Sequence, residues 1–175
     1  MSKKKYIDIL NPKINNDIFT NIIDTFLISL SILQIDKDID KTFLNIIKQK
    51  LEGKCNKNGL IKKDSINIIT YTSGVIKGED INYTVTYSCD ICNPVNGMNI
   101  ECYIKNITKA GIRAELNGYQ NSDEKSPIVL FIARDHNYNN STFINLKEND
   151  IINCKIIGSR FVLNDEFISC IGEII

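Results

Sequence analysis

Six cysteines and a single histidine are the side chains of this chain best suited to metal binding or nucleophilic chemistry. Cys89 and Cys92 form a C-x-x-C pair, which is the spacing of half a zinc site. A second ligand pair is needed, and the remaining candidates each stand alone in the sequence: Cys55, Cys102, His136, Cys154 and Cys170. In an extended strand, Cys89 and Cys92 also point to opposite faces. We therefore predict buried thiols rather than zinc ligands or disulfides.

Catalytic patterns are equally sparse. His136 is the only histidine available to activate a cysteine, and it stands in a polar segment typical of a solvated surface loop. There is no P-loop and no G-x-G-x-x-G, and the acidic run at 36–40 lacks the glycine and final glutamate of a calcium loop. The sequence predicts no catalytic residue, no metal and no cofactor.

Charge and hydropathy limit the classes of partner. The 175 residues carry 21 basic and 21 acidic side chains, so no global positive field attracts nucleic acid. No apolar run reaches the length of a membrane span, and the start of the chain shows no secretory signal. We expect an intracellular protein without a membrane partner. The chain is rich in Ile, Asn and Lys, a preference of AT-rich genomes that fits a virus or an AT-rich microbe.

The elements that must position these residues fall into two groups. In the first group, alternation around Ile7 and Ile9 predicts a short strand. Apolar residues at every fourth position predict a helix over about 14–30, and a second helix over about 40–51 ends before Gly53. A long alternation over 81–91 then predicts a strand with its odd positions buried.

After Pro94 the pattern changes to five short strands with polar loops at 117–126 and 135–149. Five strands with a long insertion before the fourth are typical of an OB-type barrel. We therefore predict an α+β protein with an N-terminal helix-plus-antiparallel-sheet, RNP-like domain over residues 1–93. A five-stranded OB-fold β-barrel would occupy residues 94–175.

Several stretches in order resemble one known family. They are LEGKCNKNGLI at 51–61, GVIKGEDINYTVTY at 74–87, NPVNGMNIECYIKNITKAGIRAEL at 93–116 and CKIIGSRFVLNDEFISCIGEI at 154–174. This series resembles the stalk subunit of multisubunit RNA polymerases, represented by the seventh subunit of eukaryotic RNA polymerase II and by its archaeal counterpart. One departure is the segment before Glu52, where two helices are predicted and the family usually has one.

The resemblance implies that the N-terminal domain docks on core subunits of a polymerase, through the loop Lys54–Gly59 and the first strand at Ile7 and Ile9. The loop residues are Lys54, Cys55, Asn56, Lys57, Asn58 and Gly59. An ordinary solvent-exposed turn is an equally good interpretation of this loop. A fourth-subunit-like stalk partner is left open, because some viral enzymes that resemble the cellular ones lack it.

The resemblance also implies that the barrel contacts nascent single-stranded RNA. Its candidate residues are Tyr103, Lys105, Lys109, Arg113, Phe131, Arg134, Tyr138, Lys155 and Arg160, with His136 beside them. From Met98 onward, however, eight Lys and Arg residues face ten Asp and Glu residues, so RNA affinity should be modest and salt-sensitive.

We therefore predict a non-catalytic stalk subunit of a DNA-directed RNA polymerase. Two rivals stay open: a free-standing OB-fold RNA-binding protein, similar to a translation factor, and an adaptor whose barrel binds only protein. A viral version would be found in the virion and host cytoplasm, and a cellular version in the nucleus.

Overall fold

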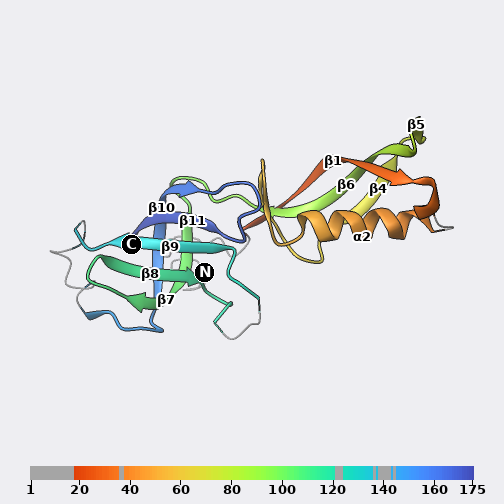
Figure 1. Ribbon diagram of the computed structural model, residues 1–175. Helices are drawn as coiled ribbons and strands as arrows, with labels where there is room; N and C mark the ends of the chain where they lie inside the picture. The colour runs from red at the N-terminus through yellow and green to blue at the C-terminus, as the bar shows by residue number, and fades with distance from the viewer. Residues whose placement is uncertain (1–17, 36–37, 121–123, 136, 138–142, 144) are drawn as a thin grey trace, which may run out of the picture. The chain divides into compact units, whose positions relative to one another are not determined.

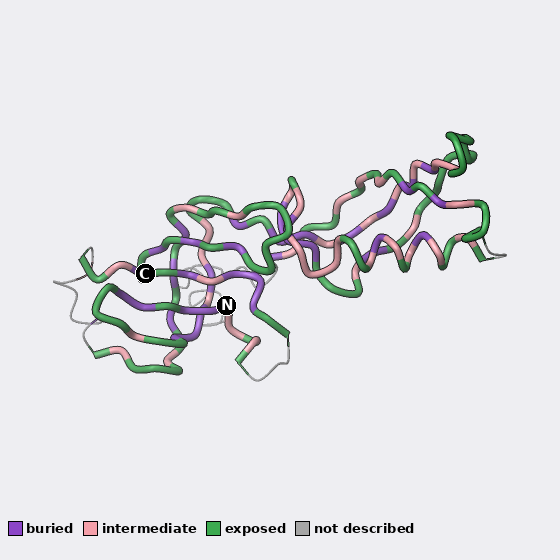
Figure 2. Tube along the Cα trace, in the orientation of Figure 1, coloured by how far each residue is buried: buried purple, intermediate pink, exposed green. Residues whose placement is uncertain are grey.

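The computed structural model describes residues 18–35, 38–120, 124–135, 137, 143 and 145–175. These residues belong to two compact units, which meet in sequence at the step from Asn93 to Pro94 (Figure 1). We call residues Phe19–Asn93 the N-terminal unit and Pro94–Ile175 the barrel unit. The Cα trace coloured by burial shows that each unit has its own buried positions (Figure 2).

A six-stranded antiparallel sheet forms one layer of the N-terminal unit. Its strands are β1 (Phe19–Ser31), β2 (Cys55–Asn56), β3 (Gly59–Ile61), β4 (Asn67–Tyr71), β5 (Val75–Lys77) and β6 (Asp80–Cys92). The central strand is β6, which pairs with β1 along its whole length and with β5, β4 and β3 in turn along its other edge. The hairpin β2–β3 and the strand β5 therefore lie at opposite ends of β6.

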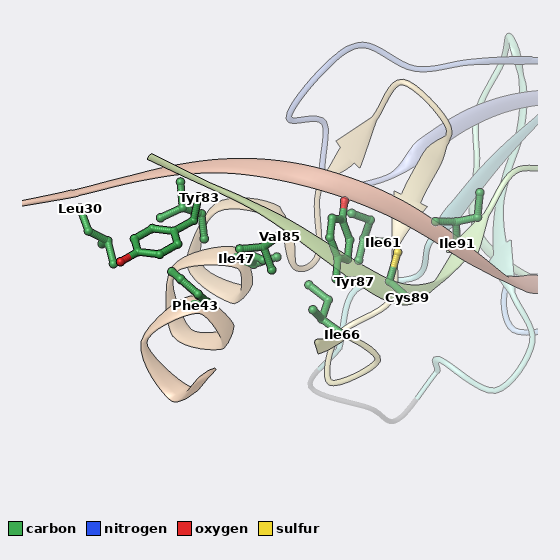
Figure 3. Packing of buried hydrophobic residues seen from close by; sticks show 11 residues of the cluster. Leu30, Phe43, Ile47, Ile61, Ile66, Tyr83, Val85, Tyr87, Cys89 and Ile91 are labelled. Carbon is green, nitrogen blue, oxygen red and sulfur yellow. The ribbon is translucent and has the colours of Figure 1, made fainter. Parts of the chain in front are cut away.

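One helix, α2 (Ile39–Leu51), covers one face of this sheet. Phe43 and Ile47 of α2 are fully buried, and they pack against Tyr83 and Val85 of β6 (Figure 3). The rings of Phe43 and Tyr83 have centroids 5.1 Å apart. Alternate residues of β6 face the helix, which confirms the predicted burial of the odd positions. Gly53 follows the helix with φ +67, as predicted for its C-terminal cap.

The helix predicted over 14–30 is wrong, because the structure places the strand β1 at Phe19–Ser31. A spacing of four residues suits both periods: Ile22, Phe26 and Leu30 share one face of a helix, but they also share one face of a strand. Threonines and β-branched residues favour the strand. The turn η1 (Ile32–Gln34) is a short 3₁₀ turn, and α2 is the only α-helix among the described residues before Glu52, where two helices were predicted. The strand predicted at Ile7 and Ile9 lies outside the described residues.

The barrel unit closes five strands: β7 (Asn99–Ile107), β8 (Gly111–Leu116), β9 (Ile128–Ala133), β10 (Ile151–Arg160) and β11 (Ile168–Ile174). Their order around the barrel is β7-β8-β9-β11-β10, and β10 pairs back to β7. The strands β9 and β11 run parallel to each other. A closed five-stranded barrel fits the predicted OB fold. Gly111 opens β8 because a Cβ there would lie 2.2 Å from the carbonyl oxygen of Ile132.

All six cysteines are buried and none is in a disulfide. Cys102, Cys154 and Cys170 fill the interior of the barrel, as predicted. Cys89 belongs to the core cluster of the N-terminal unit, where burial above all raises its pKa to about 11, so its sulfur is a neutral thiol. Within the described residues, no group of three His, Cys, Asp or Glu side chains is placed to hold a metal. None of the described helices is long and apolar enough to cross a membrane.

Candidate nucleic-acid interface and docking surface

Arg113 and Phe131 lie side by side on the outside of the barrel. They are direct partners in the antiparallel pair of β8 and β9. The side chain of Arg113 is 52% exposed and Phe131 is 39% exposed. Their neighbours in sequence on both strands point into the barrel and are fully buried: Ile112, Ala114, Leu130 and Ile132. An exposed ring beside a guanidinium group suits a nucleotide, because the ring stacks on a base and the cation attracts a phosphate.

Glu115 is the buried centre of a charged cluster on the same outer face. Its Oε2 accepts a hydrogen bond of 2.7 Å from the hydroxyl group of Tyr103. The Nζ of Lys105 lies 2.8 Å from Oε1 and 2.9 Å from Oε2 of Glu115. Arg113 Nη2 lies 3.7 Å from Oε1. Sequence analysis missed Glu115, although its position two residues after Arg113 on a strand placed both on one face.

The pKa values of this cluster fix its charges near neutral pH. Burial of Glu115 acts to raise its pKa, but the hydrogen bonds from Lys105 and Tyr103 and the charges of Lys105 and Arg113 outweigh it, so the pKa is lowered. Burial, together with the hydrogen bond to Glu115, raises the pKa of Tyr103 to about 12. The cluster therefore combines a carboxylate, two cations and a neutral phenol.

This cluster borders a hollow of about 590 Å³ on the barrel surface. Tyr119 and Phe167 supply rings to its lining, and Lys125 supplies a further cation. Lys125 forms an ion pair with Glu166. The volume falls in the range of pockets for small ligands such as a nucleotide.

A second cationic site lies at the turn between β7 and β8. Lys109 and Arg134 line a shallow hollow there, together with Ile107 and Thr108. The guanidinium group of Arg134 donates a hydrogen bond of 3.0 Å to the carbonyl oxygen of Thr108 and lies 5.5 Å from the ring centroid of Phe143. Arg134 is therefore partly committed to contacts within the protein, whereas no contact of Lys109 is seen among the described residues.

The remaining predicted RNA residues have other environments. Tyr103 belongs to the Glu115 cluster and is only 6% exposed, so little of its ring is open to solvent. Lys155 and Arg160 belong to β10, which pairs with β7 and β11 and not with β8 or β9. Lys155 lies 3.8 Å from Glu173 of β11. His136 and Tyr138 lie outside the described residues.

The predicted docking loop Lys54–Gly59 is the hairpin β2–β3, and most of its groups are used within the protein. Cys55 is buried. The side-chain oxygen of Asn56 accepts hydrogen bonds from the backbone N–H groups of Asn58 and Gly59. Asp24 of β1 also contacts the hairpin, at 3.2 Å from the side-chain nitrogen of Asn58 and 3.5 Å from Nζ of Lys57. These contacts hold the loop in place, and docking through it stays a prediction.

An exposed apolar surface, missed in the sequence analysis, lies at the opposite end of β6. We call it the apolar tip: Ile32, Leu33, Ile35, Val75 and Ile76, which are 37–96% exposed. The strand registers place these segments together, because Ile81 of β6 pairs with Leu30 on one side and with Ile76 on the other. Figure 1 shows β5 and the end of β1 at the same end of the N-terminal unit. The pair Val75-Ile76, which stands alone in the polar segment TSGVIKGED, was the available sequence signal.

Comparison with known proteins gives one informative similarity. No protein-family model matches the chain. A protein of Acanthamoeba polyphaga mimivirus, described as a candidate DNA-directed RNA polymerase subunit, is 28% identical over 158 residues. The similarity covers 85% of this chain and 77% of the mimivirus protein, so it extends across both structural units.

Proposed function

We propose that this protein is a non-catalytic stalk subunit of a DNA-directed RNA polymerase. The observation that carries the proposal is the similarity to the mimivirus protein over 85% of the chain. In this chain a helix-and-sheet unit is followed by an OB-type barrel. The family resemblance of the sequence motifs predicts the same order. In this role the N-terminal unit docks on the core enzyme and the barrel contacts the emerging transcript.

The apolar tip is the surface that we propose for docking. Exposed apolar side chains that gather on one end of a soluble unit mark protein contacts. Leu33 is 96% exposed and Ile76 is 74% exposed, so both side chains meet water unless a partner covers them. The hairpin Lys54–Gly59 stays a second prediction for docking, with fewer free groups.

For the transcript, we propose the outer face of β7, β8 and β9. Phe131 supplies an exposed ring, and Lys105, Arg113 and Lys109 supply cations around it. Contacts of this kind bind single strands with little sequence preference. If the protein is viral, it acts with its polymerase in the virion and host cytoplasm, and otherwise in the nucleus.

Affinity purification of the tagged full chain from its native source tests the proposal. The large polymerase subunits should co-purify in equal amounts with the chain. RNA or ribosomal subunits without polymerase would instead support a free-standing RNA-binding protein. Recovery of other proteins without polymerase or RNA would support an adaptor. A fourth-subunit-like stalk partner, where one exists, should appear in the same preparation.

A further inference from the structure

We propose that Glu115 restrains RNA binding by the barrel, acting as a fixed negative charge inside the cationic face. This inference rests on the proposed RNA contact and concerns its strength. Glu115 is not a residue that would bind RNA itself. Its carboxylate holds the two cations that a phosphate group would have to approach.

The position of the carboxylate is fixed by its contacts. The side chain of Glu115 is only 8% exposed. Its Oε2 accepts hydrogen bonds from Tyr103 and Lys105, and its Oε1 lies 2.8 Å from Nζ of Lys105. Tyr103 is itself buried, so the carboxylate cannot turn away when a strand of RNA arrives. Oε2 therefore has little remaining capacity to accept a hydrogen bond from a base.

The partner cations remain accessible in spite of this contact. The side chains of Lys105 and Arg113 are each 52% exposed, which leaves N–H donors for a phosphate. A phosphate bound by both cations would lie a few ångströms from the Glu115 carboxylate, because Lys105 and Arg113 touch it. Two cations and one carboxylate give this part of the surface a formal charge of about one positive unit instead of two.

Two other features of the same surface agree with a restrained site. Lys125, the further cation beside the hollow, is also paired with a carboxylate, that of Glu166. Glu124 adds another acidic side chain to the lining. A subunit that guides a moving transcript needs contacts that form and break quickly, and a built-in carboxylate lowers the affinity without removing the cations.

Glu115→Gln is the direct test, because it removes the charge and keeps the shape and one acceptor oxygen. Binding of the purified full chain to a fluorescein-labelled 12-nucleotide single-stranded RNA is measured by anisotropy at several salt concentrations. We expect the variant to bind on the order of three- to tenfold more tightly at low salt. The slope of log affinity against log salt should become steeper by up to about 0.7, which corresponds to one additional phosphate contact.

Glu173→Gln is the matched control. It removes the same charge from a carboxylate paired with Lys155 on β10 and β11, away from β8. It should change affinity much less than Glu115→Gln. Thermal melting of each variant checks that the fold is intact.

The outcomes separate this inference from the proposed function. Tighter binding by Glu115→Gln alone supports the restraint. If the wild type binds RNA and Glu115→Gln binds equally or more weakly, the restraint is wrong while the RNA role stands. If neither protein binds the RNA, both the RNA role and the restraint are wrong. If Glu115→Gln and Glu173→Gln increase RNA affinity equally, the change in net charge explains the increase, and the proposed restraint by Glu115 is wrong.

Discussion

Phe131 lies directly opposite Arg113 across the pair of strands β8 and β9. Directly opposite residues of an antiparallel pair have Cβ atoms only about 4.5–5.5 Å apart. On the other side of Phe131, Ile171 of β11 is its partner in the parallel pair and is 55% exposed. The ring therefore sits between a cation and an aliphatic side chain, at the border between a charged and an apolar part of the barrel surface.

Phe131→Ala tests the ring. If a base stacks on Phe131, the substitution should weaken binding of single-stranded RNA by about 1–3 kcal/mol. Ile171→Ala is the matched control, because it shortens the exposed neighbour of Phe131 without removing a ring. Anisotropy with a labelled RNA measures both variants. Equal losses in the two variants would contradict a stacking role.

Arg113→Ala and Arg134→Ala test the cations in the assembled enzyme. Their combination should weaken crosslinking of nascent RNA to this subunit, and unchanged crosslinking would count against the RNA role. The single variants should differ. Arg113→Ala should cause most of the loss, because Arg134 already donates to Thr108 and lies over Phe143.

Leu33→Asp with Ile76→Asp tests the apolar tip. Both side chains are exposed, so the isolated protein should keep its stability within about 0.5 kcal/mol. A buried charge in an interface without a partner is costly, so recovery of the large polymerase subunits should fall steeply. Lys57→Ala with Asn58→Ala is the comparison for the hairpin. If the hairpin pair reduces recovery and the tip pair does not, docking uses the hairpin.

The barrel was predictable because its strands alternate cleanly. Most inward positions carry Ile, Leu, Ala or Cys, so the period of two is visible in each strand apart from the bulges in β7 and β10. Strand β6 was predictable for the same reason. Strand β1 was not, since Ile22, Phe26 and Leu30 satisfy a helix and a strand equally, and the choice is made by pairing with β6, which is distant in sequence.

The candidate site was only partly predictable, because alternation gives the face of a residue but not its contacts. The outward positions of Arg113 and Phe131 follow from the alternation of apolar residues in their strands. Burial of Tyr103 does not, since it depends on a hydrogen bond to Glu115, and the bulge in β7 between Ile104 and Asn106 shifts the register beside it. The apolar tip could not be predicted from the sequence, because η1 and β5 are far apart along the chain. They come together only because β1 and β5 both pair with the same end of β6.

Gly59→Ala tests the closeness of the hairpin to β6. Gly59 has φ +139, and a Cβ there would lie 2.3 Å from the backbone carbonyl oxygen of Cys92. Because this contact is with backbone, we expect destabilisation of the N-terminal unit by more than about 2 kcal/mol. Gly78→Ala is the control: its φ is also positive, but nothing lies within 4 Å, so it should cost only about 1–2 kcal/mol. Urea unfolding measures both, and equal losses would contradict the close approach.

Cys89 should make the protein less stable at alkaline pH. Its pKa is raised to about 11 by burial, with smaller contributions from the charges of Asp24 and Asp90. In the unfolded chain a cysteine ionises near pH 8.5. A raised pKa in the folded state means that the stabilisation is complete below the unfolded pKa and is lost as the pH rises toward 11. The free energy of unfolding should therefore fall over this window, by an amount on the order of 2 kcal/mol for this thiol.

Cys89→Ala removes the titrating group and tests this assignment. The variant should lose some stability at pH 7, because Cys89 is fully buried in the core of the N-terminal unit, but its free energy of unfolding should fall less between pH 8.5 and 11. Urea unfolding at a series of pH values, under a phosphine reductant, gives both curves. Tyr87 is buried beside it with a pKa raised to about 12, mainly by burial, so both proteins also lose stability between about pH 10 and 12 from this phenol. The difference between the two curves is therefore clearest between about pH 8.5 and 10. Parallel curves for the variant and the wild type would contradict a raised pKa for Cys89.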